Sequence, residues 1–167
     1  MKRNILILSV SFFFGASLTS LDGSNGSLNN YEVENLITRS IKLAEMEKIR
    51  VTNLIEAIIV VESQGNDKAV GDTHMSEPSI GALQIRPIMV REVNRILKLK
   101  GEEDRFHLKD RYDRDKSIQM FMIWKDFYHD DSDYETIARS WNGGPRGNKN
   151  PKTLRYWEKV EEVLTSL

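Results

Sequence analysis

Apolar residues recur at helical spacing along most of the chain. In the first such segment the spacing predicts an amphipathic helix over residues 31–47 that lies on the core, with an apolar face made of Val33, Leu36, Ile37, Ile41 and Ala44. Asn53, with Glu56 three residues later, resembles a capping box. The apolar run that follows predicts a second, buried helix that ends at Gly65.

The second half of the chain repeats this pattern. Apolar faces and turn residues predict four further helices, at residues 87–99, 115–129, 134–141 and 151–164. The aromatic residues of the second of these, Phe121 and Phe127, are expected in the core. Residues 64–82 are rich in Gly and small polar residues, which predicts a long loop or a small irregular sheet. The expected fold class is mainly α, with little or no β-sheet.

The N-terminal residues are typical of a secretory signal. Lys2 and Arg3 precede an apolar run from Ile5 to Phe14, and small residues follow. We therefore expect a signal peptide at residues 1–20, a flexible leader at residues 21–30 and one folded domain at residues 31–167. The protein is then exported to the periplasm or cell envelope, and it is tethered to the membrane if the signal is not cleaved. The chain has no Cys, which excludes disulfides and lipid attachment through cysteine.

Charge and histidine spacing exclude several functions. The formal net charge is −1, and loss of Lys2 and Arg3 with the signal makes it −3, which argues against a nucleic-acid partner. His74, His107 and His129 lie far apart without the spacing of a metal site. We expect no metal, no cofactor and a monomer.

Glu62 is the candidate for chemistry. Ile55, Ile58, Ile59 and Glu62 stand on one face of the predicted buried helix, so the carboxyl group is placed among aliphatic side chains. Burial and the negative end of the helix dipole both disfavour the carboxylate and should raise its pKa. A carboxylic acid that keeps its proton near neutral pH suits the cleavage of a glycosidic bond. A glutamate in this position is more often an ordinary residue at the rim of the core.

Four sequence blocks carry a resemblance. They are VESQGN at 61–66, GALQI at 81–85, ARSWNGGP at 138–145 and Tyr156, and together they resemble the catalytic domain of the soluble lytic transglycosylases, which is related to goose-type lysozyme. The resemblance covers residues 45–160 and implies a lysozyme-like α+β domain. Ala82 and Leu83 replace the usual Leu-Met, and Trp141 stands where Tyr is common.

The resemblance implies a role for each matched residue. Glu62 is the general acid and then the base, and the substrate-binding residues are Ser63, Gly81, Gln84, Ile85, Trp141, Asn142 and Tyr156. The resemblance implies that Tyr156 orients either the N-acetyl group of the substrate or the catalytic carboxyl group. The residues themselves leave other roles open: Ser63 could cap a helix, Gly81 could serve a turn, and Trp141 could belong to the core.

The implied substrate is peptidoglycan, cleaved between N-acetylmuramic acid and N-acetylglucosamine. The substrate's own N-acetyl group assists, and the C6 hydroxyl closes a 1,6-anhydro ring. A muramidase of the same fold would use water instead, held by Asp67, Asp72 or Glu77. A protein that holds glycan without cutting it, or that works with a secretion or conjugation apparatus, is a further alternative, as is a helical adaptor unrelated to sugars.

Overall fold

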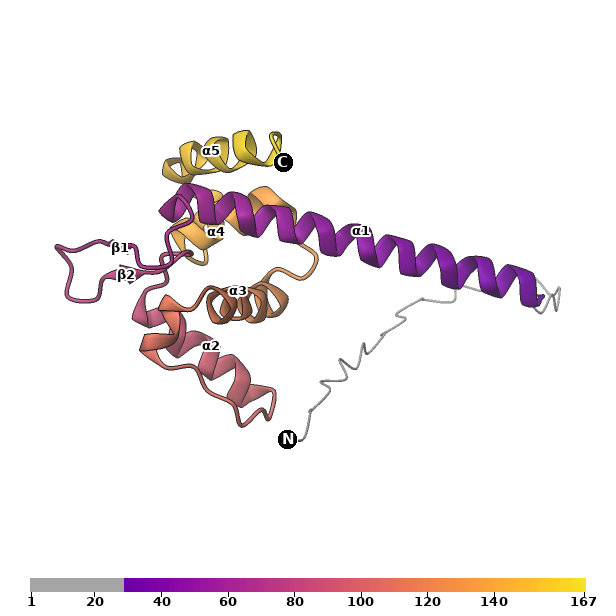
Figure 1. The fold of residues 1–167 in the computed structure, drawn as a ribbon, viewed down its shortest axis with the longest axis horizontal. Coiled ribbons are helices and arrows are strands. Elements are labelled where there is room, and N and C mark those ends of the chain that lie inside the picture. Colours follow the sequence, from indigo (N-terminus) through magenta and orange to yellow (C-terminus); the bar gives the residue numbers. More distant parts are fainter. Residues whose placement is uncertain (1–28) are drawn as a thin grey trace. The chain divides into compact units, whose positions relative to one another are not determined.

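The computed structural model describes residues 29–167 (Figure 1). The chain divides into two units, the first ending at Arg39 and the second comprising Ser40–Leu167. The predicted signal peptide and most of the predicted leader lie outside the described residues. The elements are α1 (Asn30–Ser63), β1 (Val70–Gly71), β2 (Ser79–Ile80), α2 (Pro87–Leu99), η1 (Leu108–Tyr112), α3 (Arg114–Tyr128), α4 (Tyr134–Gly143), η2 (Gly147–Lys149), η3 (Pro151–Thr153) and α5 (Leu154–Leu164).

The first helix differs from the prediction, because α1 is continuous through the point where two helices were expected. The capping box lies at the true start: the Asn29 side chain accepts from the Glu32 amide at 2.9 Å, and Glu32 accepts from the Asn29 amide at 2.9 Å. The predicted capping box at Asn53 is wrong. No Gly or Pro stands between residues 30 and 63, so the backbone has no cause to leave the helix.

The predicted burial of the first apolar face is also wrong. Leu36 and Ile37 are 51% and 54% exposed, and in the second unit Ile41 is 55% exposed. Val33 and Ala44 are exposed as well. Helical periodicity predicts which residues share a face, and it cannot say whether another element covers that face.

From Val51 onward, α1 enters the core of the second unit. Its buried residues are joined by side chains of α2, α3, α4 and α5, including Val93, Phe121, Ala138 and Val160. Figure 1 shows α2 beside α3. The backbones of α2 and α3 approach closely, and so do those of α4 and α5. Phe121 is fully buried as predicted, whereas Phe127 is 38% exposed at the end of its helix.

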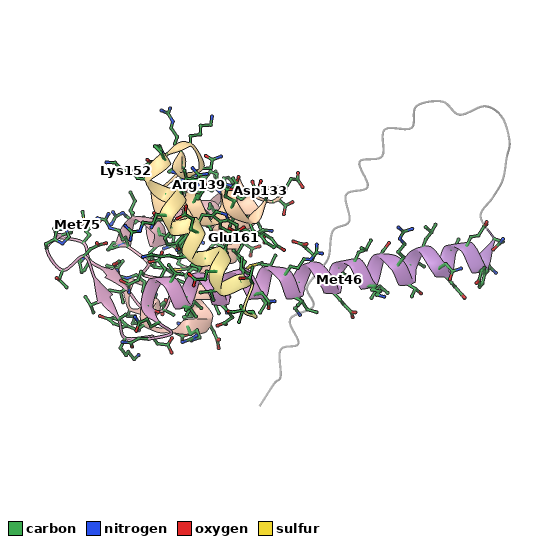
Figure 2. The ribbon with its side chains drawn as sticks, turned by 90° about the horizontal axis from the view of Figure 1, so that it is seen from above. Met46, Met75, Asp133, Arg139, Lys152 and Glu161 are labelled. Atoms are coloured by element: carbon green, nitrogen blue, oxygen red, sulfur yellow. The ribbon has the colours of Figure 1, made fainter. Side chains whose placement is uncertain are left out.

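A two-stranded antiparallel hairpin interrupts the helices between α1 and α2. Val70 pairs with Ile80 and Gly71 with Ser79, and Met75 lies in the connection between the strands (Figure 2). The loop or small irregular sheet predicted for this region is confirmed, and so is the mainly helical fold class. Among residues 29–167 no helix is long and apolar enough to cross a membrane.

The last helix is positioned through a buried arginine. Arg139 of α4 donates from Nε to Thr153 Oγ1 at 3.0 Å and from a terminal nitrogen to the Asn150 carbonyl at 3.2 Å. Figure 2 shows Arg139 and Lys152 on neighbouring segments. The turn after α4 is thereby held against the start of α5, which carries Tyr156. The predicted last helix splits into η3, which Pro151 opens, and α5.

Candidate active site

A cavity of about 790 Å³ opens between the ends of several elements of the second unit. Its size is typical of a small-molecule site. The end of α1, the segment after β2, the start of α2 and the ends of α3 and α4 supply the wall, which consists of Glu62, Asp72, Ser79, Gln84, Ile85, Arg86, Ile88, Met89, Glu92, Trp124, Tyr128, His129, Ser140, Trp141, Asn142, Gly143, Gly144 and Pro145.

Glu62 lies on this wall in the last turn of α1. Its Oε1 accepts a hydrogen bond from the Tyr156 hydroxyl at 2.8 Å. Burial raises the pKa of Glu62 to about 7; the Tyr156 hydrogen bond acts in the opposite direction, and the charge of Asp72 adds to the increase. The structure therefore agrees with the predicted direction, and a large share of Glu62 is protonated near neutral pH.

Tyr156 donates its hydroxyl proton to the hydrogen bond with Glu62. Its burial and the neighbouring Glu62 charge raise the pKa of the Tyr156 hydroxyl well above its ordinary value, so the phenol keeps its proton. Tyr156 does not line the cavity; it reaches Glu62 from α5, behind the wall. Its contact is with the candidate acid, which fits one of the two roles that the resemblance implied.

Ser63 does not line the cavity. Its hydroxyl contacts the Ile59 carbonyl at 3.1 Å and donates to the Ala82 carbonyl at 2.8 Å. The second bond ties the end of α1 to the segment that carries Gln84 and Ile85. Ser63 therefore holds these two walls together, and its predicted contact with substrate stays a prediction.

Gln84 lines the cavity with a side chain that is largely engaged. Its amide nitrogen donates to the Gly81 carbonyl at 2.9 Å and contacts the Ala69 carbonyl at 3.4 Å, and its amide oxygen accepts from Ser79 at 2.9 Å. These bonds hold Gln84 at a positive φ of 48°. The amide oxygen keeps one lone pair for a ligand, so Gln84 can offer an acceptor more readily than a donor.

Gly81 serves the backbone and does not line the cavity. Its φ is +81°, and a Cβ at this position would stand 1.8 Å from the Arg111 carbonyl oxygen. This close approach supports the interpretation of Gly81 as a turn residue, and its predicted contact with substrate stays a prediction. Ile85 is 1% exposed, lines the cavity and exchanges two backbone hydrogen bonds with Ile80.

The sequence block at the end of α4 supplies another part of the wall. Trp141 lines the cavity and packs edge-on against Phe121 and Trp124, with ring centroids 4.8 Å and 5.2 Å apart, so it belongs to both wall and core. Asn142 is exposed on the wall. The structure thus brings Glu62, Gln84, Ile85, Trp141 and Asn142 to one cavity from separate parts of the chain.

Sequence reasoning missed several wall residues. Trp124, Tyr128 and His129 form an aromatic end of the cavity, and Arg86 lines the part where α2 begins. They share no periodic signal that could separate them from ordinary core or surface residues. In the described part of the chain no group of His, Asp or Glu is arranged to hold a metal ion.

The three loop acids considered for water binding behave differently. Asp67 pairs with Arg114 at 2.9 Å, and Glu77 accepts two bonds from Arg91 at 2.9 Å and 3.0 Å. Neither lines the cavity. Asp72 does, and its carboxylate makes no hydrogen bond or ion pair with any residue in 29–167. Glu92 also lines the cavity but is paired with Arg95, so Asp72 is the wall carboxylate besides Glu62 that no arginine engages among residues 29–167.

Comparison of the sequence with known proteins gives a short match. No protein family model matches the chain. A lysozyme of Magallana gigas is 64% identical over 28 residues, which make up 17% of this chain and 20% of that protein. The chain thus aligns with about a fifth of the length of this curated relative.

A solved structure is similar over a longer stretch. A chain in the crystal structure of Aeromonas hydrophila PliI in complex with Meretrix lusoria lysozyme matches with a TM-score of 0.54 and 20% identity, over 66% of this chain and 88% of that chain. At this identity the likeness is one of fold. The mainly helical, lysozyme-like fold expected from the sequence is confirmed, and the narrower assignment to the lytic transglycosylases stays a prediction.

Proposed function

We propose that this protein cleaves the glycan strands of peptidoglycan, with Glu62 as the general acid. The observation that carries the proposal is Glu62 on the wall of a substrate-sized cavity, with a pKa of about 7. Transfer of a proton to the departing sugar oxygen needs an acid of this kind. The short match to a lysozyme supports the same class of substrate.

In the proposed reaction Glu62 protonates the oxygen between N-acetylmuramic acid and N-acetylglucosamine as that bond breaks. The acetamido oxygen of the substrate assists at the anomeric carbon, and the C6 hydroxyl then closes the 1,6-anhydro ring. Glu62 recovers its proton from this hydroxyl, so the acid is regenerated. Tyr156 orients the Glu62 carboxyl group through their 2.8 Å hydrogen bond, and Asn142 lies on the wall where it can contact the reacting sugar.

The test is digestion of purified sacculi by wild type and Glu62→Gln. We expect the substitution to reduce the release of soluble fragments at least about 100-fold, because the amide of Gln cannot donate the proton that the departing sugar oxygen needs. Glu56→Gln is the matched control, since Glu56 lies on the same helix, is 45% exposed and is absent from the cavity wall. Equal activity in wild type and Glu62→Gln would remove Glu62 from the reaction and leave a protein that only holds glycan.

Hydrolysis by a muramidase of the same fold is the second candidate, and Asp72 favours it. An unpaired carboxylate on the cavity wall can hold and activate a water molecule. Mass spectrometry of the products separates the two outcomes, because ring closure leaves anhydro ends and hydrolysis leaves reducing ends. If water attacks, Asp72→Asn should lose most of the reducing-end product; if the ring closes, it should still release anhydro ends.

We also propose that the protein acts in the cell envelope, where its substrate lies. The proposal rests on the signal-like residues 1–20. Cell fractionation of the full chain checks it: recovery from the envelope or periplasm is expected, and recovery from the cytoplasm alone would contradict it. A role beside a secretion or conjugation apparatus would use the same activity.

A further inference from the structure

Arg86 is a cation on the cavity wall with unused hydrogen-bond donors. It is partly buried, at the point where α2 begins. Its Nε contacts the Glu77 carbonyl oxygen at 3.4 Å, which is a long bond. The two terminal nitrogens of Arg86 make no hydrogen bond or ion pair with any residue that the structure describes.

Two acidic residues near Arg86 are already engaged by other arginines. Both oxygens of Glu77 accept from Arg91, at 2.9 Å and 3.0 Å. Glu92, on the same wall as Arg86, accepts from Arg95 at 2.9 Å and 2.7 Å. Glu77 and Glu92 are therefore paired with Arg91 and Arg95, and Arg86 has no carboxylate partner among the residues that the structure describes.

The other acids of the cavity leave the terminal nitrogens of Arg86 free. Glu62 is about half protonated near pH 7, and neither Glu62 nor Asp72 forms an ion pair with Arg86. A guanidinium group offers planar, parallel donors that match the two oxygens of a carboxylate. A ligand that brought a carboxylate to this wall would satisfy both terminal nitrogens of Arg86.

We propose that Arg86 binds a carboxylate of the substrate and so makes the cavity selective for acidic glycan. This inference rests on the proposed function and adds a specificity-determining residue to it. Two sources of the carboxylate share the same chemistry: the lactyl group of a muramic acid without peptide, and the stem peptide of a substituted one. Neutral chitin-like glycan lacks both.

Binding measured by titration of the full chain tests the proposal. The probes are the disaccharide N-acetylglucosaminyl-N-acetylmuramic acid, which lacks the scissile linkage, its neutral methyl ester, and a derivative whose lactyl group carries a dipeptide with a free carboxylate. We expect wild type to bind a carboxylate-bearing probe roughly 5- to 20-fold more tightly than the ester. Arg86→Gln should lose this preference, and Arg86→Lys should retain part of it.

Lys98→Gln is the matched control, because it removes the same charge from an exposed position of α2 away from the cavity. Preference for the peptide-free acid identifies the lactyl carboxylate, and preference for the dipeptide derivative alone identifies the stem. Retention of the full preference by Arg86→Gln, or its absence in a wild type that still cleaves sacculi, overturns the inference and leaves the proposed function standing. If wild type neither binds these probes nor cleaves sacculi, both this inference and the proposed function are wrong.

Discussion

Tyr156 and Glu62, 94 residues apart in the chain, meet in a 2.8 Å hydrogen bond from the phenol to the carboxyl oxygen. The bond comes from behind the cavity wall, so one face of the carboxyl group is held while another faces the cavity. It also acts against burial, because a hydrogen bond to the charged form lowers the pKa of Glu62. The hydrogen bond thus orients the carboxyl group and keeps its pKa near 7.

Tyr156→Phe should raise the pKa of Glu62 further above its ordinary value. Cleavage by an acid falls as the pH passes its pKa, so we expect wild-type kcat/KM to fall above about pH 7. In the variant this fall should move to higher pH, with a lower kcat because the carboxyl group is less well oriented. Tyr134→Phe is the control, since Tyr134 donates to Glu47 at 3.1 Å, outside the cavity. An unchanged profile in Tyr156→Phe would contradict the prediction.

Asp72→Asn should shift the pKa of Glu62 in the opposite direction. The Asp72 charge raises the pKa of Glu62 by repulsion, so a neutral side chain at this position should lower it. NMR titration of the labelled Glu62 carboxyl carbon measures this effect without any need for turnover. Asp67→Asn is a suitable comparison, because Asp67 is paired with Arg114 and lies off the cavity wall. A pKa that rises in Asp72→Asn would be incompatible with this account.

The stability of the fold should depend on pH through Glu62. Its pKa is about 7 in the folded protein against 4.5 when unperturbed, so the folded state holds the proton more tightly. This contribution is fully present below about pH 4.5 and is lost as the pH rises to about 7. Above pH 7 wild type has to bury a charged carboxylate, whereas the amide of Glu62→Gln stays neutral at every pH. Above pH 7 we therefore expect the variant to be more stable than wild type by about 1–3 kcal/mol.

Chemical denaturation of both proteins at pH 4 and pH 8 checks this expectation. The other titrating groups are common to the two proteins and cancel in the difference. A difference in the free energy of unfolding that stays constant between the two pH values would show that Glu62 titrates alike in the folded and unfolded states.

Gly81→Ala should destabilise the protein far more than Gly101→Ala. Both glycines have positive φ, +81° and +76°, so both substitutions carry backbone strain. At Gly81 the new Cβ would also stand 1.8 Å from the Arg111 carbonyl, whereas nothing lies within 4 Å of one at Gly101. We expect a cost of about 1 kcal/mol at Gly101 and more than about 3 kcal/mol at Gly81. Equal losses in thermal unfolding would contradict the close approach.

The sequence by itself determined the elements that depend on neighbours along the chain. Helical spacing located the buried half of α1 and placed Glu62 on the apolar face with Ile55 and Ile59, and from that burial the direction of its pKa shift followed. Apolar spacing also located α2, with Val93 on its buried face, because residues three and four positions apart share one side of a helix wherever that helix lies.

Only the tertiary structure decided which groups meet across the chain. The Arg111 carbonyl leaves no room for a side chain at Gly81, and Ser79 and Gly81 bind the amide of Gln84. Arg114 and Arg91 form ion pairs with Asp67 and Glu77, which lie off the cavity wall. Asp72 remains on the wall. Whether an apolar face such as that of Ile41 is covered was decided there too. The physical reason is that burial, hydrogen-bond partners and electrostatic neighbours depend on distances in space, and residues far apart in sequence leave no local pattern of those distances.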